Sequence, residues 1–310
     1  TPRADAIMGA AEMGPRGRRL LEALLDIAHP DVPVLITQAD ADQPQIFAAL
    51  RELGRLGEAV PRHVHFLDLL HLDRPASRNY NAARLAQLDD WLVSLGGQSA
   101  TGEALARAEL AVARLANLAG QIAMLRHHGQ ISGTDCLRIT GASAILPMEE
   151  AAVLLERLHE QLRAASSAQV ATTVLVCGTA HEGTELYEAV EACGSRIIAD
   201  GHGWALPGQL PARVDAPRRV GQWTAELAEA VKPDIVLHLT IDGDEAAPWD
   251  VAAIERALPE SQRFAALRCA SVPDERFVEA LNAVLAGEPI PAPPPRPASP
   301  KPAAARPSPS

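Results

Sequence analysis

Residues 172–204 read TTVLVCGTAHEGTELYEAVEACGSRIIADGHGW, and this stretch decides the fold. An apolar run ends at Gly178, a loop and an amphipathic segment follow, and Gly194 precedes a second apolar run. This order is typical of a strand, a helix and a second strand, which together form a βαβ unit. Because such units carry functional residues on the loops after their strands, chemistry is expected at 177–183 and at 200–203.

The same order of strand and helix repeats toward the C-terminus. Apolar runs at 235–239 and 264–267 predict two more strands. Amphipathic segments at 221–231, 250–258 and 273–284 predict the helices between and after them. We therefore expect an α/β fold, in which residues 169–287 form a Rossmann-like lobe around a parallel, doubly wound sheet.

A smaller α/β lobe is predicted for residues 1–100. The apolar runs VLIT at 34–37 and HVHFLDLL at 63–70 predict its strands, and helices are expected at 44–53 and 76–95.

Residues 101–168 are predicted to form a helical linker between the two lobes. Thr101 is a plausible N-cap, and apolar residues recur with helical spacing over about 25 residues after it. Another helix is expected to begin at Pro147. The tail at 288–310 is almost wholly Pro, Ala and Ser, so we expect it to be disordered.

Charge and hydropathy limit the kinds of partner and the cellular location that we expect for this protein. The net charge of −11 argues against nucleic acid and against anionic membrane surfaces as partners. The chain contains neither an apolar run of bilayer length nor the apolar core of a signal peptide. We expect a soluble, cytoplasmic protein.

The four cysteines are Cys136, Cys177, Cys193 and Cys269. None lies within three residues of another, so the sequence offers no ligand pair of the zinc type. We interpret all four as small, buried, apolar side chains. Cys177 is the position to watch because it ends a predicted strand beside the glycine loop.

The loop at 178–184 is the candidate ligand-binding segment. Backbone N–H groups at the start of the following helix could hold a phosphate or a thioester carbonyl, although a plain tight connection explains the loop equally well. The candidate ligand-binding residues are Gly178, Thr179, His181, Gly183 and Thr184.

His181 and His202 are the candidate catalytic residues, because each follows a predicted strand and a histidine can act there as acid, base or ligand. No G-x-S-x-G motif supports a serine hydrolase. The acidic loops with Asp40 and Asp42 and with Asp242, Asp244 and Glu245 could hold a hard cation, but we favour solvated loops.

Several segments together resemble one enzyme family. They are ISGTD at 131–135 followed by LPMEE at 146–150, the βαβ unit at 174–200, PDIV at 233–236 and the helix at 276–285. In this order they are similar to the 2-hydroxyacyl-CoA dehydratase and benzoyl-CoA reductase family, and the resemblance covers roughly residues 10–285.

The resemblance implies both architecture and chemistry. Members have two Rossmann-like lobes joined by helices, and paired subunits hold iron–sulfur clusters through cysteines on loops after the strands. An ATP-hydrolysing activator supplies low-potential electrons, and the substrate is an acyl-CoA thioester. Against this family the first lobe of the present chain looks N-terminally shortened.

This chain departs from the family at the cluster ligands. The resemblance places the family's cysteines at about Gly14, Ala39, Gly203 and Gly243, and none of these is cysteine. An iron–sulfur cluster needs several thiolates. We therefore expect no cofactor and no metal in this chain, with [4Fe–4S] clusters expected in its partner subunits.

The sequence thus predicts a cluster-less, non-catalytic accessory subunit of a dehydratase or reductase complex. Its expected partners are cysteine-bearing paralogous subunits, an acyl-CoA substrate and an ATP-dependent activator, with no nucleic acid and no membrane. The alternative is a stand-alone protein that binds a CoA ester or another small molecule in the two-lobed cleft.

Overall fold

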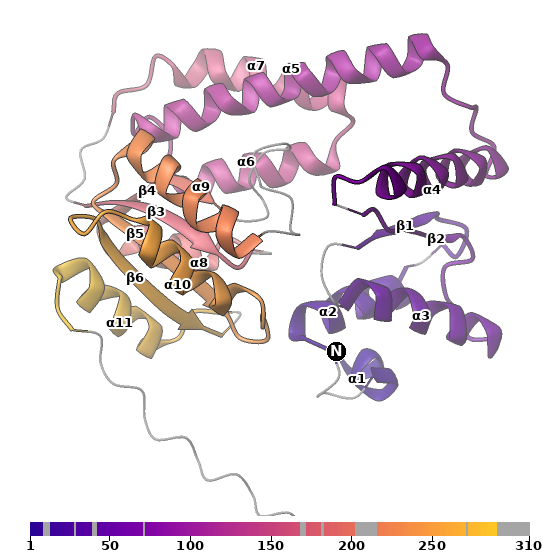
Figure 1. Cartoon of the computed structure of the whole chain (residues 1–310), viewed down its shortest axis with the longest axis horizontal. Coiled ribbons are helices and arrows are strands. Elements are labelled where there is room, and N and C mark those ends of the chain that lie inside the picture. The colour runs from indigo at the N-terminus through magenta and orange to yellow at the C-terminus, as the bar shows by residue number, and fades with distance from the viewer. Residues whose placement is uncertain are drawn as a thin grey trace, which may run out of the picture.

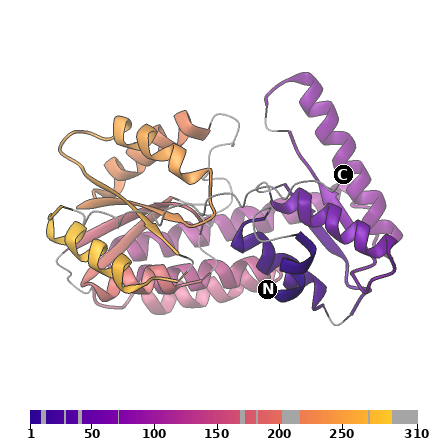
Figure 2. The same cartoon turned by 90° about the horizontal axis from the view of Figure 1, so that it is seen from below.

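The computed structural model describes residues 1–8, 13–27, 29–38, 42–70, 72–167, 172–180, 183–201, 216–270 and 272–289. It confirms the predicted α/β fold with two parallel sheets, which lie on opposite sides of the molecule (Figures 1 and 2). Ala39, His181, His202 and Gly203 lie outside the described residues, as does nearly all of the tail predicted to be disordered.

The smaller sheet consists of β1 (Val34–Thr37) and β2 (Val64–Leu67), paired in parallel. Helices α1 (Pro2–Met8), α2 (Pro15–Leu25), α3 (Asp42–Arg55) and α4 (Pro75–Ser94) belong to the same lobe. Leu21 of α2, Ile36 of β1 and Ile46 of α3 are among the residues that close its core. The two N-terminal helices were not predicted from the sequence.

The larger sheet has four parallel strands in the order β4-β3-β5-β6. The strands are β3 (Thr172–Gly178), β4 (Ser195–Gly201), β5 (Ile235–Ile241) and β6 (Arg263–Cys269). The helices are α8 (Glu185–Ala192), α9 (Ala216–Val231), α10 (Ala247–Ala257) and α11 (Glu275–Ala286). All four predicted strands are confirmed.

Continuous apolar runs form these strands because both faces of the sheet are covered. On one face, Val174 and Val176 of β3 pack with side chains of α8 and α11. On the other face, Leu175 and Cys177 pack with side chains of α9 and α10. Alternate residues of one strand therefore enter two different cores.

The linker consists of α5 (Gly102–His127), α6 (Gly133–Ile145) and α7 (Met148–Leu162), and α5 and α7 run across the top of Figure 1. Thr101 caps α5 as predicted, since its hydroxyl accepts a hydrogen bond of 3.2 Å from Ala104 N. Ser132 caps α6 in the same way, accepting from Asp135 N at 3.0 Å. None of the helices that the structure describes combines the length and hydropathy needed to cross a bilayer.

Candidate functional site

The strand order places a topological switch point at the carboxyl-terminal edge of the larger sheet, between β3 and β5. After β3 the chain turns toward β4 on one side, and after β5 it turns toward β6 on the other. Open parallel sheets bind ligands at such a point, outside the carboxyl ends of the two strands. In this sheet Gly178 and Thr179 lie at the carboxyl end of β3, and the loop 242–246 follows the carboxyl end of β5.

Gly178 and Thr179 pack closely against β5 through their backbones. Gly178 has a φ of +105°, and a β-carbon there would lie 2.3 Å from the carbonyl oxygen of Leu239. Only glycine is compatible with both conditions. Thr179 follows, and its N–H donates to the same Leu239 oxygen at 2.9 Å. The predicted ligand-binding residues Gly178 and Thr179 therefore lie at the switch point.

Asp244 connects the end of β3 to the start of α10 at the switch point. The Thr179 hydroxyl donates to one Asp244 oxygen at 2.7 Å, while the other accepts from Ala246 N and Ala247 N at 2.9 and 3.0 Å. Asp242 accepts a 2.6 Å bond from Arg268. Asp244 is thus held by donors at the start of α10 and Asp242 by Arg268 of β6, so both carboxylates of this loop have structural partners.

His238 is the functional candidate that sequence reasoning missed. It lies in β5 and is fully buried, and a β-carbon on Gly178 would be 3.1 Å from its Nε2 atom. Burial lowers its pKa to about 4, so the imidazole is neutral at pH 7. Nε2 has no hydrogen-bond partner among the residues that the structure describes. One feature of the sequence could have identified this residue, because His238 interrupts the mostly apolar run IVLHLTI.

Asp250 adds a second perturbed group in the first turn of α10. Burial, together with the charge of Asp244, raises the pKa of this carboxyl to about 6. The neutral imidazole of His238 and the carboxyl of Asp250 are therefore both close enough to Asp244 for its charge to affect their pKa values. Perturbed titratable groups at a crevice are typical of functional sites, although structural networks also produce them.

The N-terminus of α8 holds the other candidate ligand-binding residues. The Thr184 hydroxyl donates to Glu188 at 2.7 Å, and a β-carbon on Gly183 would lie 2.0 Å from a carboxylate oxygen of Glu185. Two carboxylates therefore occupy the first turn of α8, where a bound anion would be repelled. A ligand role for Gly183 and Thr184 stays a prediction, and His181 is outside the described residues.

The two lobes meet at this edge. Gly14, which precedes α2, lies against the loop after β5, and a β-carbon on Gly14 would be 3.6 Å from the carbonyl oxygen of Gly243. Asp42 at the start of α3 also lies against Gly14, with an oxygen that accepts from Gly14 N at 3.5 Å. Gly243 has a φ of +95°. Two positions that the family resemblance assigns to cluster cysteines are therefore in contact.

Comparison with protein families gives a match over most of this chain. The family model described as 2-hydroxyglutaryl-CoA dehydratase, D-component, matches residues 45–269, which include both strands of the switch point. The chain belongs to this family. No curated protein matches it.

Within the dehydratase D-component family, the chain's own thiols are the remaining candidates for cluster ligands. Cys136, Cys177 and Cys269 are buried in three different cores, and Cys193 packs against the core that contains Cys269. Burial raises the pKa of all four thiols, most strongly at Cys177. Since a thiolate is the form that ligates metal, these side chains are suited to packing.

Asp200, which closes the family-like βαβ unit, points away from the switch point. It forms a buried ion pair with Arg126 of α5 and accepts a hydrogen bond from Tyr187 at 3.0 Å. The aspartate that makes the unit look family-like therefore fastens the linker to the larger sheet.

Proposed function

We propose that this chain is a cluster-less accessory subunit of a 2-hydroxyacyl-CoA dehydratase or benzoyl-CoA reductase type of complex. Its role is to complete the heteromer and to shape the acyl-CoA channel, while a cysteine-bearing paralogous subunit carries the [4Fe–4S] cluster. An ATP-dependent activator would supply electrons to that partner.

The observation that carries the proposal is the contact between Gly14 and Gly243. A β-carbon on Gly14 would be in ordinary van der Waals contact with Gly243 O, at 3.6 Å, and in tighter contact with a side-chain oxygen of Asp42, at 3.2 Å. A thiol at Gly14 would enter a space bounded by Asp42, and a side chain at Gly243 would be strained by its positive φ. The proposal is supported by the proximity of two positions at which the resemblance expects cysteine and at which this chain carries glycine.

The residues present do not fit an iron–sulfur cluster. Four thiolates are usual, or three with an open iron site. Gly14 and Gly243 supply none, and Ala39 and Gly203 carry no sulfur either. We derive no redox step in this chain.

The test is the metal content of the purified full-length chain. After anaerobic reconstitution with ferric iron and sulfide, followed by desalting, we expect less than roughly one tenth of a cluster per chain, because a cluster requires several thiolates. A Gly14→Ala variant is the matched control for adventitious iron. Stoichiometric iron and sulfide with a visible charge-transfer band would contradict the proposal.

A stand-alone CoA-ester binding protein is the second candidate, and the switch point favours it because β3 and β5 are both supplied by this one chain. Native mass measurement distinguishes the accessory subunit from the stand-alone binding protein. Stable assembly with a cysteine-bearing subunit of the same family supports the accessory role. A monomer whose melting temperature rises with an acyl-CoA, and which binds no such subunit, supports the binding protein.

A further inference from the structure

The outer surface of α10 carries an exposed tryptophan among carboxylates. Trp249, in the first turn of this helix, is 78% exposed. Glu245 precedes the helix, Glu255 lies in its last turn and Glu260 follows it, and all three are exposed. Because α10 covers one face of the larger sheet, these side chains lie on the outside of the molecule (Figure 1). We call these four residues the acidic surface of α10.

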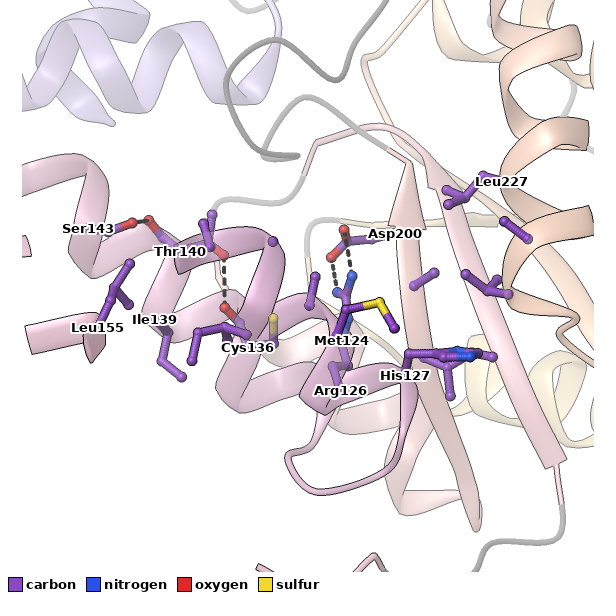
Figure 3. A pocket seen from close by; sticks show the side chains of 18 of the residues that line it. Met124, Arg126, His127, Cys136, Ile139, Thr140, Ser143, Leu155, Asp200 and Leu227 are labelled. Atoms are coloured by element: carbon purple, nitrogen blue, oxygen red, sulfur yellow. Dashed lines mark hydrogen bonds and ion pairs between the residues drawn. The ribbon is translucent and has the colours of Figure 1, made fainter. Parts of the chain in front are cut away.

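The carboxylates of this surface are available to a partner. Asp200 of the same lobe is buried and paired with Arg126 (Figure 3), whereas the three glutamates form no ion pair within the part of the chain that the structure describes. Arg256 on α10 offsets one of their charges, so an acidic excess remains. The whole lobe at 169–287 contains twice as many acidic as basic residues. An exposed indole with carboxylates around it favours a cationic partner.

The chain carries a cationic segment of this kind in its own tail. Residues 289–310 contain Arg296, Lys301 and Arg306 and no acidic residue. The three cations recur at intervals of five residues, and each is followed directly by proline. A proline-rich sequence favours the extended polyproline II conformation, which loses little entropy on binding and is recognised by exposed aromatic side chains.

The tail begins close to the carboxyl end of α10. Arg263, at the start of β6, donates to the carbonyl oxygen of Val284 at 2.6 Å, so α11 ends beside the short connection that carries Glu260. The 11 residues of α10 extend about 16 Å. Cations five residues apart in a polyproline II segment are separated by about 15 Å. Two successive cations of the tail therefore match the length of this helix.

We propose that the cationic tail binds the acidic surface of α10 in the same molecule, with its prolines and cations packed on Trp249. The glutamates supply the opposite charge. A short tether holds the tail at an effective concentration of about 1 mM, so an interaction as weak as ~1 mM still covers Trp249 for roughly half of the time. This contact goes beyond the proposed function and does not depend on it.

Hydroxyl-radical footprinting of the full-length chain, read by mass spectrometry, measures how far Trp249 is covered. In an R296Q/K301Q/R306Q variant the tail keeps its prolines but loses its charge. We expect Trp249 to be oxidised about twice as fast in this variant as in the parent, because the parent tail covers it for roughly half of the time. These substitutions lie in the tail, outside the helices and strands of the fold.

Two controls separate charge from other effects. An A298Q/A303Q/A305Q variant introduces the same number of glutamines and keeps all three cations, so Trp249 should be oxidised as slowly as in the parent. Met124 on α5 is 52% exposed and lies outside the acidic surface, and its oxidation rate should be the same in every variant.

The acidic surface is tested by the reciprocal change. We expect E245Q/E255Q/E260Q to speed the oxidation of Trp249 as the tail variant does, and E149Q/E150Q/E160Q, which neutralises exposed carboxylates on α7, to leave it unchanged.

Equal oxidation of Trp249 in the parent and in the R296Q/K301Q/R306Q variant would overturn the proposal. Protection that increases with protein concentration would also overturn it, because the occupant would then be the tail of another copy.

Discussion

At the residue scale, Gly243 holds a backbone conformation that strongly disfavours side chains. Its φ of +95° is in the left-handed region, where a β-carbon crowds the backbone. The family resemblance places a cysteine at about this position. A cysteine at Gly243 would therefore be strained in the backbone conformation that this loop adopts.

Replacing Gly243 with cysteine should destabilise the protein. We expect Gly243→Cys to lower the free energy of unfolding by about 1–2 kcal/mol, the usual cost of a left-handed conformation. Gly141→Cys is the control, because Gly141 is in a helix with open space around it, and there the loss of glycine should be neutral or slightly stabilising. Urea unfolding measures both. A Gly243→Cys variant as stable as the parent would show that the loop relaxes freely.

Asp250 should make stability depend on pH. Its pKa in the folded protein is about 6, above the unfolded value of about 4, so the folded state holds this proton more tightly. This contribution to stability is therefore full below pH 4 and falls as pH rises toward 6. The contribution of His238 to stability depends on pH in the opposite direction. Its pKa in the folded protein is lowered to about 4, so this contribution is lost as pH falls.

An Asp250→Asn variant separates these two effects, since it leaves His238 in place. Relative to the parent, we expect the variant to gain stability between pH 4 and pH 7, measured as the difference in urea midpoints at each pH. A constant difference across this range would mean that Asp250 titrates normally.

At the element scale, the attachment of the linker to the larger sheet depends on few groups. Arg126 on α5 and Asp200 on β4 are 7% and 14% exposed at their side chains, so neither can be solvated if its partner is removed. The pair is supported by the Tyr187 hydroxyl from α8. Breaking a buried pair leaves an uncompensated charge.

We expect Asp200→Ala to cost about 3–5 kcal/mol of unfolding free energy. Glu156→Ala is the matched control, because it removes the carboxylate partner of Arg114 on the same helix α5, where the side chains are 49% and 46% exposed. Exposed pairs contribute about 0–1 kcal/mol. Similar losses in the two variants, measured by urea unfolding, would show that burial does not strengthen the dependence on Asp200.

Most elements were predictable because local patterns determine them. The strands at 172–178 and 235–241 are apolar runs that must be covered on both faces, and Thr101 lies where a cap is expected. His238 and the Arg126–Asp200 pair could not be found in this way. A histidine inside a strand has no periodic signature, and a contact between residues 74 apart depends on the tertiary fold.

At the scale of the whole molecule, the two lobes have separate hydrophobic cores. Ile46 belongs to the core of the smaller lobe and Leu281 to one core of the larger, and both are fully buried. None of the core clusters in the described part of the chain contains residues from both sheets. Multi-core chains often unfold in more than one step.

Differential scanning calorimetry should therefore resolve two transitions that respond to different substitutions. We expect Ile46→Ala to lower one melting temperature and Leu281→Ala to lower the other, each through a loss of about 2–5 kcal/mol. The partner transition serves as the internal control in each variant. If both substitutions shifted a single transition equally, the lobes would unfold as one cooperative unit.

The ion pair between Arg126 on α5 and Asp200 on β4 cannot form until both residues have been synthesised. Arg126 leaves the ribosome 74 residues before Asp200, and at ~5–20 residues per second this interval is on the order of 4–15 seconds. Throughout it Asp200 is not available to the guanidinium, and the side of α5 that will face β4 is not covered by that strand. Slower translation would lengthen the exposure of this surface to chaperones and to other nascent chains.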